Sequence, residues 1–484
     1  MAISPRNQAL GAMFIFLAGL LVGRAAGESL SPATQSANVK VNVAVKNDSI
    51  VCKSFIGFGA EWNPYYAAEV SDAQWSLVAK RMAWMRIPAV RMLMMTRWCY
   101  LGEGRYDWET PEMKILYRHL DICQKLGVSV FLADWGCERG WVSAPGIAGI
   151  DDPKYAAAIG TYLDYLVNQR GYTCLKYFIL VNEPNNEARS WEVWKQGVRN
   201  VAGVLAQRGL NKKVLQVGSD ATFDVTWHQR AVDQLPDVLG VYDMHIYALD
   251  KVVRAGELET LFQGMRDYAN TRDPKGKDKP FIVGEAGMHD DAKHPHGNPH
   301  INEHWYGMFM ADYAVQAARA GCASVLAWQM DDTSHAGFFW GLWSASADGM
   351  KLRPWFFPWS LLSRYIPAGS TIYRPDAVSP AVRVLAARAP GKDGQAAGWT
   401  FCVVNRGDAP ATVTLTAPAE ISSQPATAPS KSVTFKRYLY SPEPLAIDAD
   451  GFPKPTGEIT ADPARGLDTI VPANAVVVLT SLPW

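Results

Sequence analysis

Short apolar runs alternate with longer amphipathic stretches from residue 55 to residue 366. Each run has the length of a strand, and each stretch repeats its apolar residues at helical spacing. The pattern predicts strands over 55–59, 89–95, 128–134, 177–182, 214–219, 241–246, 281–284 and 324–329. The first predicted helix begins at Ser71, and the other seven cover 112–126, 153–170, 191–208, 226–235, 257–270, 301–320 and 355–366. Eight strand–helix repeats are typical of a closed (β/α)8 TIM barrel, so we expect an α/β fold of that type over 51–366.

The rest of the chain has a different pattern. Residues 367–484 contain strand-like runs and no convincing helix, with turns rich in Pro, Gly and Asp between the runs. The predicted strands cover 382–386, 400–404, 412–416, 432–440 and 475–480. This pattern predicts an accessory C-terminal β-sandwich. Valine alternates with polar or small residues over 39–45, so we expect an N-terminal strand within 28–50 to join that sandwich.

The first 27 residues have the three parts of a secretory signal peptide. Arg6 supplies a positive charge, residues 9–23 are apolar or Gly, and Ala25 and Gly27 are small residues before a cleavage point. The apolar stretch is short for a membrane span and Arg24 ends it, so we expect no stable membrane anchor. The sequence therefore predicts a secreted or periplasmic protein.

The amino-acid composition limits the classes of molecule that the protein is expected to bind. Apolar residues make up 48% of the chain and charged residues 19%, which is typical of a folded protein with a large core. Basic and acidic residues both number 47, so no excess positive charge favours a nucleic-acid partner. The seven cysteines include no CxxC pair, which argues against a zinc module or a disulfide scaffold.

Two glutamates stand at the ends of apolar strands. Glu183 ends the fourth predicted strand and Glu285 the seventh, and these strands face each other across the mouth of a barrel. Glycosidic cleavage needs two carboxyl groups on opposite sides of one cleft, one protonated and one ionised. We expect Arg91, on the second strand, to keep Glu285 ionised. Trp135, Glu61 and Trp62 also end strands and are candidates for contact with a sugar.

The segment YFILVNEPNN resembles the Asn-Glu-Pro signature of the large clan of retaining (β/α)8 glycoside hydrolases. The resemblance implies that Glu183 is the general acid/base and that Asn182 binds the sugar 2-hydroxyl. FIVGEAG resembles the segment that carries the nucleophile, which corresponds to Glu285. These roles imply hydrolysis by double displacement, with a carbohydrate substrate and no cofactor.

Three further segments extend the resemblance, and together with the two above they lie in the order expected for the clan. DMHIY implies that Tyr247 contacts the nucleophile and that His245 lines the pocket. AVRM implies that Arg91 lies beside the nucleophile, and LAWQ that Trp328 forms an aromatic platform under the sugar. The opening GFGAEW and the segment 352–372 are similar to families with an attached β-sandwich, such as glycoside hydrolase families 30 and 39.

Other interpretations remain open at this point. Histidines crowd residues 289–304, but their spacing is not that of HExxH, so we expect a loop beside the cleft and no metal site. The preferred hypothesis is an exported retaining β-glycoside hydrolase that acts on an oligosaccharide or polysaccharide. The alternative is a non-catalytic glycan-binding protein on the same barrel, which a glycosyl adduct trapped on Glu285 would exclude.

Overall fold

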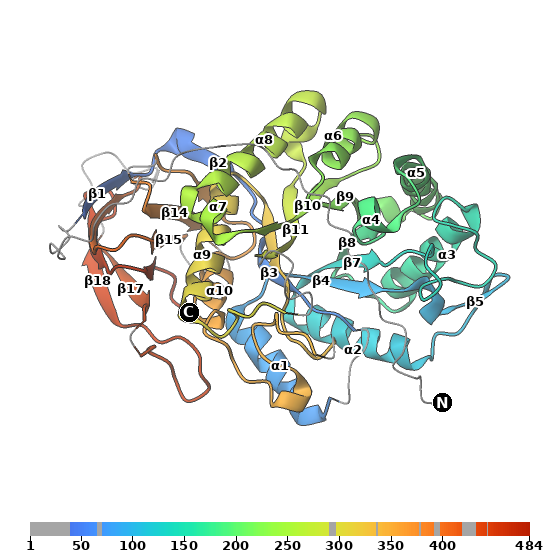
Figure 1. The fold of residues 1–484 in the computed structure, drawn as a ribbon, viewed down its shortest axis with the longest axis horizontal. Helices are drawn as coiled ribbons and strands as arrows, with labels where there is room; N and C mark the ends of the chain where they lie inside the picture. Colours follow the sequence, from blue (N-terminus) through green and yellow to red (C-terminus); the bar gives the residue numbers. More distant parts are fainter. Residues whose placement is uncertain are drawn as a thin grey trace, which may run out of the picture. The chain divides into compact units, whose positions relative to one another are not determined.

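A closed barrel of parallel strands is the centre of the fold in the computed structural model, which describes residues 39–64, 70–289, 297–334, 337–376, 379–391, 397–418, 432–442 and 444–484 (Figure 1). Its strands are β3 (Gly57–Glu61), β4 (Ala89–Met94), β7 (Ser129–Asp134), β8 (Leu175–Leu180), β9 (Leu215–Thr222), β10 (Val241–Ala248), β11 (Phe281–Met288) and β12 (Ser324–Ala327). Each pairs with the next along the chain, and β12 closes the barrel against β3. The predicted α/β barrel is therefore confirmed.

Helices follow the barrel strands in the predicted alternation. They are α1 (Asp72–Met85), α2 (Pro111–Leu126), α3 (Pro153–Asp164), α5 (Trp191–Gln207), α6 (Val225–Gln234), α8 (Glu257–Arg272), α9 (His304–Arg319) and α10 (Phe356–Tyr365). The helix α1 begins with a capping box, because Ser71 Oγ accepts from Gln74 N (3.3 Å) and Gln74 Oε1 accepts from Ser71 N (2.9 Å). The short helices α4 (Pro184–Glu187) and α7 (Asp250–Ala255), and a hairpin of β5 (Tyr100–Gly102) and β6 (Arg105–Tyr106), were not predicted.

Two sheets form the accessory sandwich. One contains β2 (Ile50–Cys52), β13 (Thr371–Tyr373), β14 (Val382–Ala389), β15 (Gly398–Asn405), β17 (Val433–Tyr440), β18 (Gly457–Ala461) and β20 (Ala475–Thr480). The other contains β1 (Val39–Ala44), β16 (Ala411–Thr416) and β19 (Leu467–Val471). In Figure 1, β1 is blue and lies against strands coloured red, because it pairs in parallel with β16. The segment before the barrel thus forms strands in both sheets.

The larger sheet is buried on both faces. Along β15, Phe401 and Val403 pack into the core between the two sheets, whereas Cys402 and Val404 pack into the core shared with the barrel. This is the two-residue period of a strand, with apolar residues at odd and even positions alike. Helix α9 lies against β14, β15 and β20, and its residues from Tyr306 to Arg319 are all buried. Barrel and sandwich therefore share one core.

Polar contacts also join the barrel to the sandwich. Arg383 on β14 donates from Nη1 to both carboxylate oxygens of Asp312 on α9, at 3.1 and 2.9 Å. The hydroxyl groups of Tyr365 on α10 and Tyr438 on β17 lie 2.6 Å apart. Both pairs are buried in the apolar interface, where a polar group without a partner would be costly. The pairing supplies each side chain with a hydrogen bond there.

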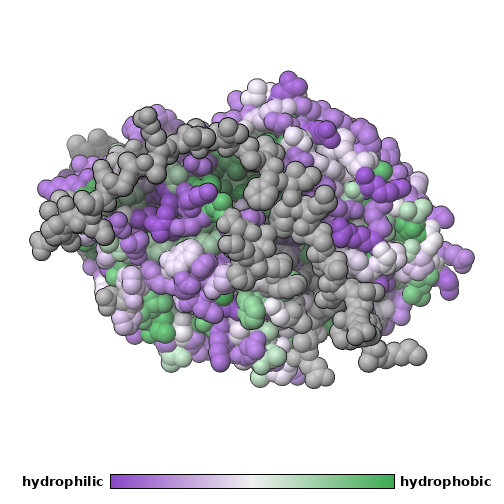
Figure 2. Space-filling view, in the orientation of Figure 1, coloured by the Kyte–Doolittle hydropathy of each residue, from purple (hydrophilic) through white to green (hydrophobic). Residues whose placement is uncertain are grey.

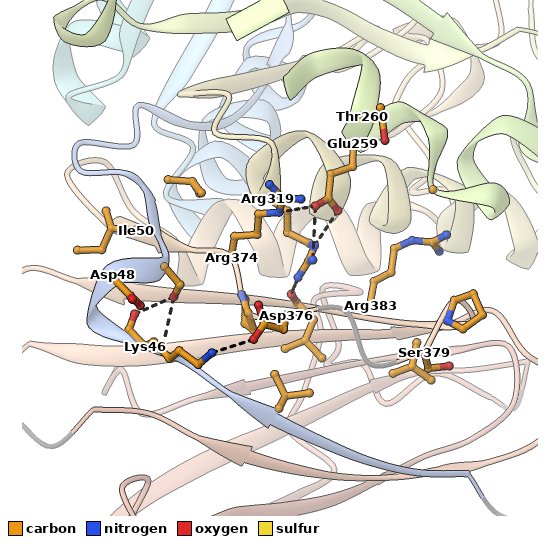
Figure 3. Close-up of a pocket in the computed structure, with 18 of the residues that line it drawn as sticks. Lys46, Asp48, Ile50, Glu259, Thr260, Arg319, Arg374, Asp376, Ser379 and Arg383 are labelled. Carbon is orange, nitrogen blue, oxygen red and sulfur yellow. Dashed lines mark hydrogen bonds and ion pairs between the residues drawn. The ribbon is translucent and has the colours of Figure 1, made fainter. Parts of the chain in front are cut away.

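A cavity of about 650 Å³ opens beside the sandwich and contains none of the predicted site residues (Figure 3). Arg319 and Arg374 both pair with Glu259 on its wall, at 2.8 and 2.9 Å, and Lys46 pairs with Asp376 at 2.9 Å. Each of these cations has an acidic partner, and two of them share the single carboxylate of Glu259. In Figure 2 hydrophilic and hydrophobic residues are interspersed over the face in view.

Three features relate to the predicted location of the protein: the state of its cysteines, the character of its helices and the signal peptide. All seven cysteines are free thiols, and six of them are buried. None of the helices within the described ranges combines the length and the apolar character that crossing a membrane would require. The predicted signal peptide lies outside the described residues.

Candidate active site

The strand ends on one side of the barrel carry the two predicted catalytic glutamates. Glu285 lies within β11, and Glu183 follows β8 by three residues. The backbone between β8 and Glu183 is unusual, because Val181 (φ 70°) and Glu183 (φ 46°) both adopt left-handed conformations. Such conformations are unfavourable for residues with a Cβ and occur mainly where a site requires them. The left-handed turn places Glu183 at the start of the short helix α4.

The two carboxyl groups converge on one histidine. Nδ1 of His245 lies 3.1 Å from Oε1 of Glu183 and 3.6 Å from Oε1 of Glu285. A ligating atom of each of the three side chains lies within 4.8 Å of the others. The Glu183 side chain is 23% exposed and that of Glu285 is 6% exposed. One glutamate is thus open to solvent while the other is nearly enclosed.

Two donors hold Glu285 in place. Arg91 donates from Nη1 to Oε1 (2.9 Å), and Tyr247 donates its hydroxyl proton to Oε2 (2.7 Å). The preceding residue, Gly284, fits closely against the neighbouring strand, where a Cβ would lie 2.3 Å from Oδ2 of Asp243. Both oxygens of Glu285 are therefore fixed, and its strand can approach β10 because residue 284 has no side chain.

Arg91 is the centre of a buried network of charges. Besides Glu285, its Nη1 donates to Oε2 of Glu61 (2.6 Å). Its Nη2 donates to Oδ1 of Asn182 (2.8 Å) and to Oδ2 of Asp220 (2.8 Å). The guanidinium is wholly buried and binds groups from four different strand ends. It therefore fixes the relative positions of the residues on either side of the site.

Asp220 is a site residue that the sequence pattern missed. It is wholly buried on β9, and its Oδ1 lies 3.0 Å from Nε2 of His245. Its Oδ2 accepts from the backbone N–H of Glu183 (3.3 Å) as well as from Arg91. The fifth strand was predicted to end at Ser219, three residues before the end of β9 and one residue before Asp220. The available signal was an acidic residue directly after the apolar run, the same signal that identified the two glutamates.

The pKa of Glu285 differs from the expected one. Burial is the largest effect and raises this pKa, in total to about 8. The negative charges of Glu61 and Glu183 act in the same direction, while His245 and Arg91 act against it. Arg91 lowers the pKa of Glu285, as predicted, but burial and the neighbouring carboxylates outweigh it, because one guanidinium is shared among several of them.

His245 is held as a cation. Burial alone would lower its pKa, but Asp220 and Glu285 raise that pKa well above its ordinary value. The pKa of Asp220 is lowered in turn, because Arg91 and His245 outweigh the effect of its burial. An imidazolium donates from both nitrogens and has no lone pair for a metal. In the described part of the chain, the groups with metal-like spacing both include His245, so they form a hydrogen-bonded cluster.

The predicted aromatic residues divide into two kinds. Trp328 follows β12, and its backbone N–H donates to the carbonyl of Ala286 (2.9 Å), which places its backbone beside β11. The peptide bond from Trp328 to Gln329 is cis. Trp135 follows β7, is half-buried, and meets Trp141 edge to face with ring centres 5.1 Å apart. Both residues therefore follow barrel strands at the end that carries Glu183 and Glu285.

Trp62 and Glu61 are both buried and have partners within the protein. The Trp62 ring is 4% exposed and packs against His119 and Trp75, with ring centres 4.1 and 6.1 Å apart. Glu61 is 1% exposed and faces Arg91. Packing accounts for Trp62 and the charge network for Glu61, so their positions give no support to direct contact with substrate.

The histidine-rich segment is described only in part, since residues 290–296 lie outside the described ranges. His300 pairs with Glu303 at 2.9 Å, and His304 stacks on Tyr440 with ring centres 4.3 Å apart. Each of these histidines thus has a structural partner.

Comparisons with known proteins agree with this geometry. The model of the cellulase family, glycosyl hydrolase family 5, matches residues 46–334. Among solved structures, a family 30 subfamily 8 xylanase from Clostridium acetobutylicum aligns with 13% identity over 91% of this chain and 99% of its own, with a TM-score of 0.63. A glucosidase from Croceicoccus marinus aligns with 8% identity over 92% and 99%, with a TM-score of 0.62. An α-L-arabinofuranosidase from Thermotoga maritima aligns with 14% identity over 91% and 99%, with a TM-score of 0.60.

Among curated proteins no match is found. The structural likenesses extend over both the barrel and the sandwich, and at these identities they establish the fold. The family model covers more than half of the chain, including both glutamates and the residues around Arg91. The chain is therefore a glycoside hydrolase and belongs to glycosyl hydrolase family 5.

Proposed function

We propose that this enzyme is an exported β-glycoside hydrolase that retains the anomeric configuration of its substrate. The observation that carries the proposal is the approach of Glu183 and Glu285 to within 4.8 Å at their nearest ligating oxygens. Retaining enzymes place their carboxyl groups about 5 Å apart, whereas inverting enzymes leave room for a water molecule between them. The substrate is a neutral oligosaccharide or polysaccharide, which needs no metal or cofactor for this chemistry.

In the first step Glu285 attacks the anomeric carbon and Glu183 gives its proton to the glycosidic oxygen. A glycosyl–Glu285 ester forms, and the leaving sugar departs as an alcohol. Tyr247 and Arg91 orient the attacking carboxylate through the bonds to its two oxygens. Asn182 is oriented by Arg91, so its NH2 group can donate to a hydroxyl of the bound sugar.

In the second step Glu183 removes a proton from water, which attacks the same anomeric carbon from the side that the leaving sugar vacated. The ester breaks and Glu285 is released as a carboxylate. The greater exposure of Glu183 supports this role, since its carboxyl group must meet both the departing sugar and the incoming water. Two inversions at one carbon give net retention.

The substitutions Glu285→Gln and Glu183→Gln test the assignment, because Gln keeps the shape of Glu but can neither attack nor transfer the proton. We expect each variant to lose at least about 1000-fold in kcat on the polysaccharide that wild type cleaves best in a glycan screen. Glu259→Gln is the matched control, since Glu259 is also an ion-paired glutamate of low exposure but lies on the cavity beside the sandwich. It should keep wild-type kcat.

Three further readings complete the test. NMR of the first product should show the β-anomer, and a 2-fluoro glycoside should leave a stable adduct on Glu285. Wild-type kcat in either active-site variant, or an α-anomeric first product, would contradict the mechanism. A protein that binds glycans without any turnover or adduct would instead fit the non-catalytic alternative.

Export is tested separately. When the full chain is produced in a Gram-negative host, we expect a periplasmic or secreted protein that lacks about the first 27 residues. N-terminal sequencing of the purified enzyme gives the cleavage point. An intact N-terminus on protein found only in the cytosol would contradict export without affecting the catalytic assignment.

A further inference from the structure

The acidic groups of the active site outnumber its cations. In the described part of the chain, the cations are Arg91 and His245, and the acidic side chains around them are Glu61, Glu183, Asp220, Asp243 and Glu285. Four of these acids make a hydrogen bond to one of the two cations. Among the described residues, no hydrogen bond joins Asp243 to either cation. A buried carboxylate without a cationic partner is costly, so Asp243 differs from the other four acids.

Asp243 is enclosed between neighbouring strands. It lies on β10 and is wholly buried, and its Oδ1 accepts from the backbone N–H of Gly284 on β11 (2.7 Å). None of the N–H groups or hydroxyls of the described residues donates to its Oδ2. A carboxyl oxygen of Asp243 lies within 4.8 Å of one of Asp220 and of a ring nitrogen of His245. Asp243 thus has one oxygen that is satisfied, and it faces a second carboxyl group.

The surroundings of Asp243 favour a proton on it. The charged groups that face it are Asp220 on β9, His245 on β10 and Arg91 on β4. Burial is the largest effect and raises the pKa of Asp243 well above its ordinary value, and the negative charge of Asp220 acts in the same direction. Arg91 and His245 act against this rise, but both bind Asp220 directly. Of the two facing carboxyl groups, Asp220 is therefore the one that ionises, and Asp243 keeps the proton.

The reaction supplies a second argument, from the balance of charge. When Glu285 attacks, it must be ionised while Glu183 still holds its proton. If Asp243 were ionised as well, it would join Glu61, Asp220 and Glu285, so that four carboxylates would face two cations in an almost wholly buried site. A neutral Asp243 removes one of these negative charges and can still donate a hydrogen bond.

We propose that Asp243 keeps a proton at the pH of catalysis and donates it in a hydrogen bond to the Asp220 carboxylate, as a neutral positioning residue of the active site. The donating oxygen is Oδ2, because Oδ1 accepts from Gly284. Asp220 in turn holds Nε2 of His245 and the backbone N–H of Glu183. The effect of Asp243 on catalysis rests on the proposed function, whereas the proton on Asp243 does not.

The same substitution at the two facing aspartates tests the assignment. Asn has the shape of a protonated Asp, so in Asp243→Asn the side-chain oxygen can accept from Gly284 and the NH2 group can donate to Asp220. We expect kcat/KM of this variant to stay within about threefold of wild type, and both limbs of its pH profile to stay within about half a pH unit. Asp220→Asn removes a charge and should lose about 10- to 100-fold. Asp243→Leu can neither donate nor accept, and should lower kcat/KM about tenfold.

Infrared spectroscopy detects the proton without any substrate. A protonated carboxylic acid has a carbonyl band above the amide bands, and this band shifts when the protein is exchanged into D2O. The difference between the spectra of wild type and Asp243→Asn at neutral pH should contain one such band. Asp468→Asn is the control, because Asp468 is an exposed aspartate on β19 of the sandwich, and its difference spectrum should contain none.

A difference spectrum of Asp243→Asn without that band shows an ionised Asp243 and overturns the proposal. A larger shift of the pH profile or a larger loss of kcat/KM in Asp243→Asn overturns it as well, since the substitution would then have removed a charge. Wild-type kcat/KM in Asp243→Leu overturns the positioning role. If Asp243→Leu does not fold, the pH profile and the spectrum of Asp243→Asn still decide. Wild type that cleaves no glycoside refutes the proposed function, while the infrared band still tests the proton.

Discussion

Asp220 Oδ1 lies 3.0 Å from His245 Nε2, and this pair is buried beside Glu183 and Glu285. The same imidazole faces Glu183 and Glu285 with its other nitrogen. Asp220 therefore fixes the ring that contacts both Glu183, the proposed acid/base, and Glu285, the proposed nucleophile, and it stabilises the charge on that ring. It is a positioning residue, since it acts through His245 and Arg91.

Replacing Asp220 by Asn should lower kcat/KM by about 10- to 100-fold, because small displacements of reacting groups are costly. The pKa of His245 should also fall, since its main counter-ion is lost. The pH profile of kcat/KM should therefore change shape, with the loss of activity growing as pH rises and His245 loses its proton. A reduced profile of unchanged shape would contradict this role. Asp312→Asn is the control, and it should alter the Tm without altering the profile.

Ionisation of Glu285 should lower the free energy of unfolding at neutral pH. Its pKa rises from 4.5 in the unfolded chain to about 8 in the folded one, so between these values the folded state retains a proton that the unfolded state has released. Stability from this group is complete below pH 4.5 and is lost as pH rises through 8. Glu285→Gln removes the titration, so its Tm should exceed that of wild type by about 1–3 °C at pH 8 and by less at pH 5. Equal differences at the two pH values, measured by calorimetry, would contradict the raised pKa.

Glu61 should set the pH at which the nucleophile ionises. Its negative charge is one of the causes that raise the pKa of Glu285, through the Arg91 Nη1 that the two carboxyl groups share. In Glu61→Gln the acidic limb of the kcat/KM profile should move to lower pH, by about half a pH unit. Glu138→Gln, which removes a carboxylate paired with Arg189, should leave that limb in place. No movement in Glu61→Gln would show that Glu61 carries a proton in the working enzyme.

The ion pair between Arg383 and Asp312 should be strongly coupled. Arg383→Met leaves a buried carboxylate without its main partner, and should lower the free energy of unfolding by about 3 kcal/mol. Adding Asp312→Asn to that variant should recover part of the loss, because the buried charge is then gone. Chemical denaturation of the wild type and the three variants gives the coupling. Additive losses would show that the pair contributes no interaction of its own.

The barrel was predictable because its pattern is local. Each strand between 57 and 327 is an apolar run of the right length, and its helix follows at regular spacing. The positions of Glu183 and Glu285 were predictable for a related reason, since parallel strands bring their carboxyl ends to one side.

The charge balance of the site was not predictable in the same way. The sequence places Arg91 near Glu285, but it does not show that Glu61 and Asp220 share the same guanidinium. A pKa depends on the sum of burial and all nearby charges, which only the three-dimensional arrangement supplies. The left-handed backbone at Val181 and Glu183 was not predictable either, because no residue propensity favours that conformation there.

Both faces of β15 are buried, and this limits whether the barrel and the sandwich can be produced as separate proteins. A barrel expressed alone from 51 to 366 would present the side of α9 that now meets Cys402 and Val404 to water, and would aggregate. The sandwich alone would expose the reverse of its larger sheet. The sandwich is thus a structural part of the barrel domain. Evolution or engineering can exchange the sandwich only together with the helices that it covers.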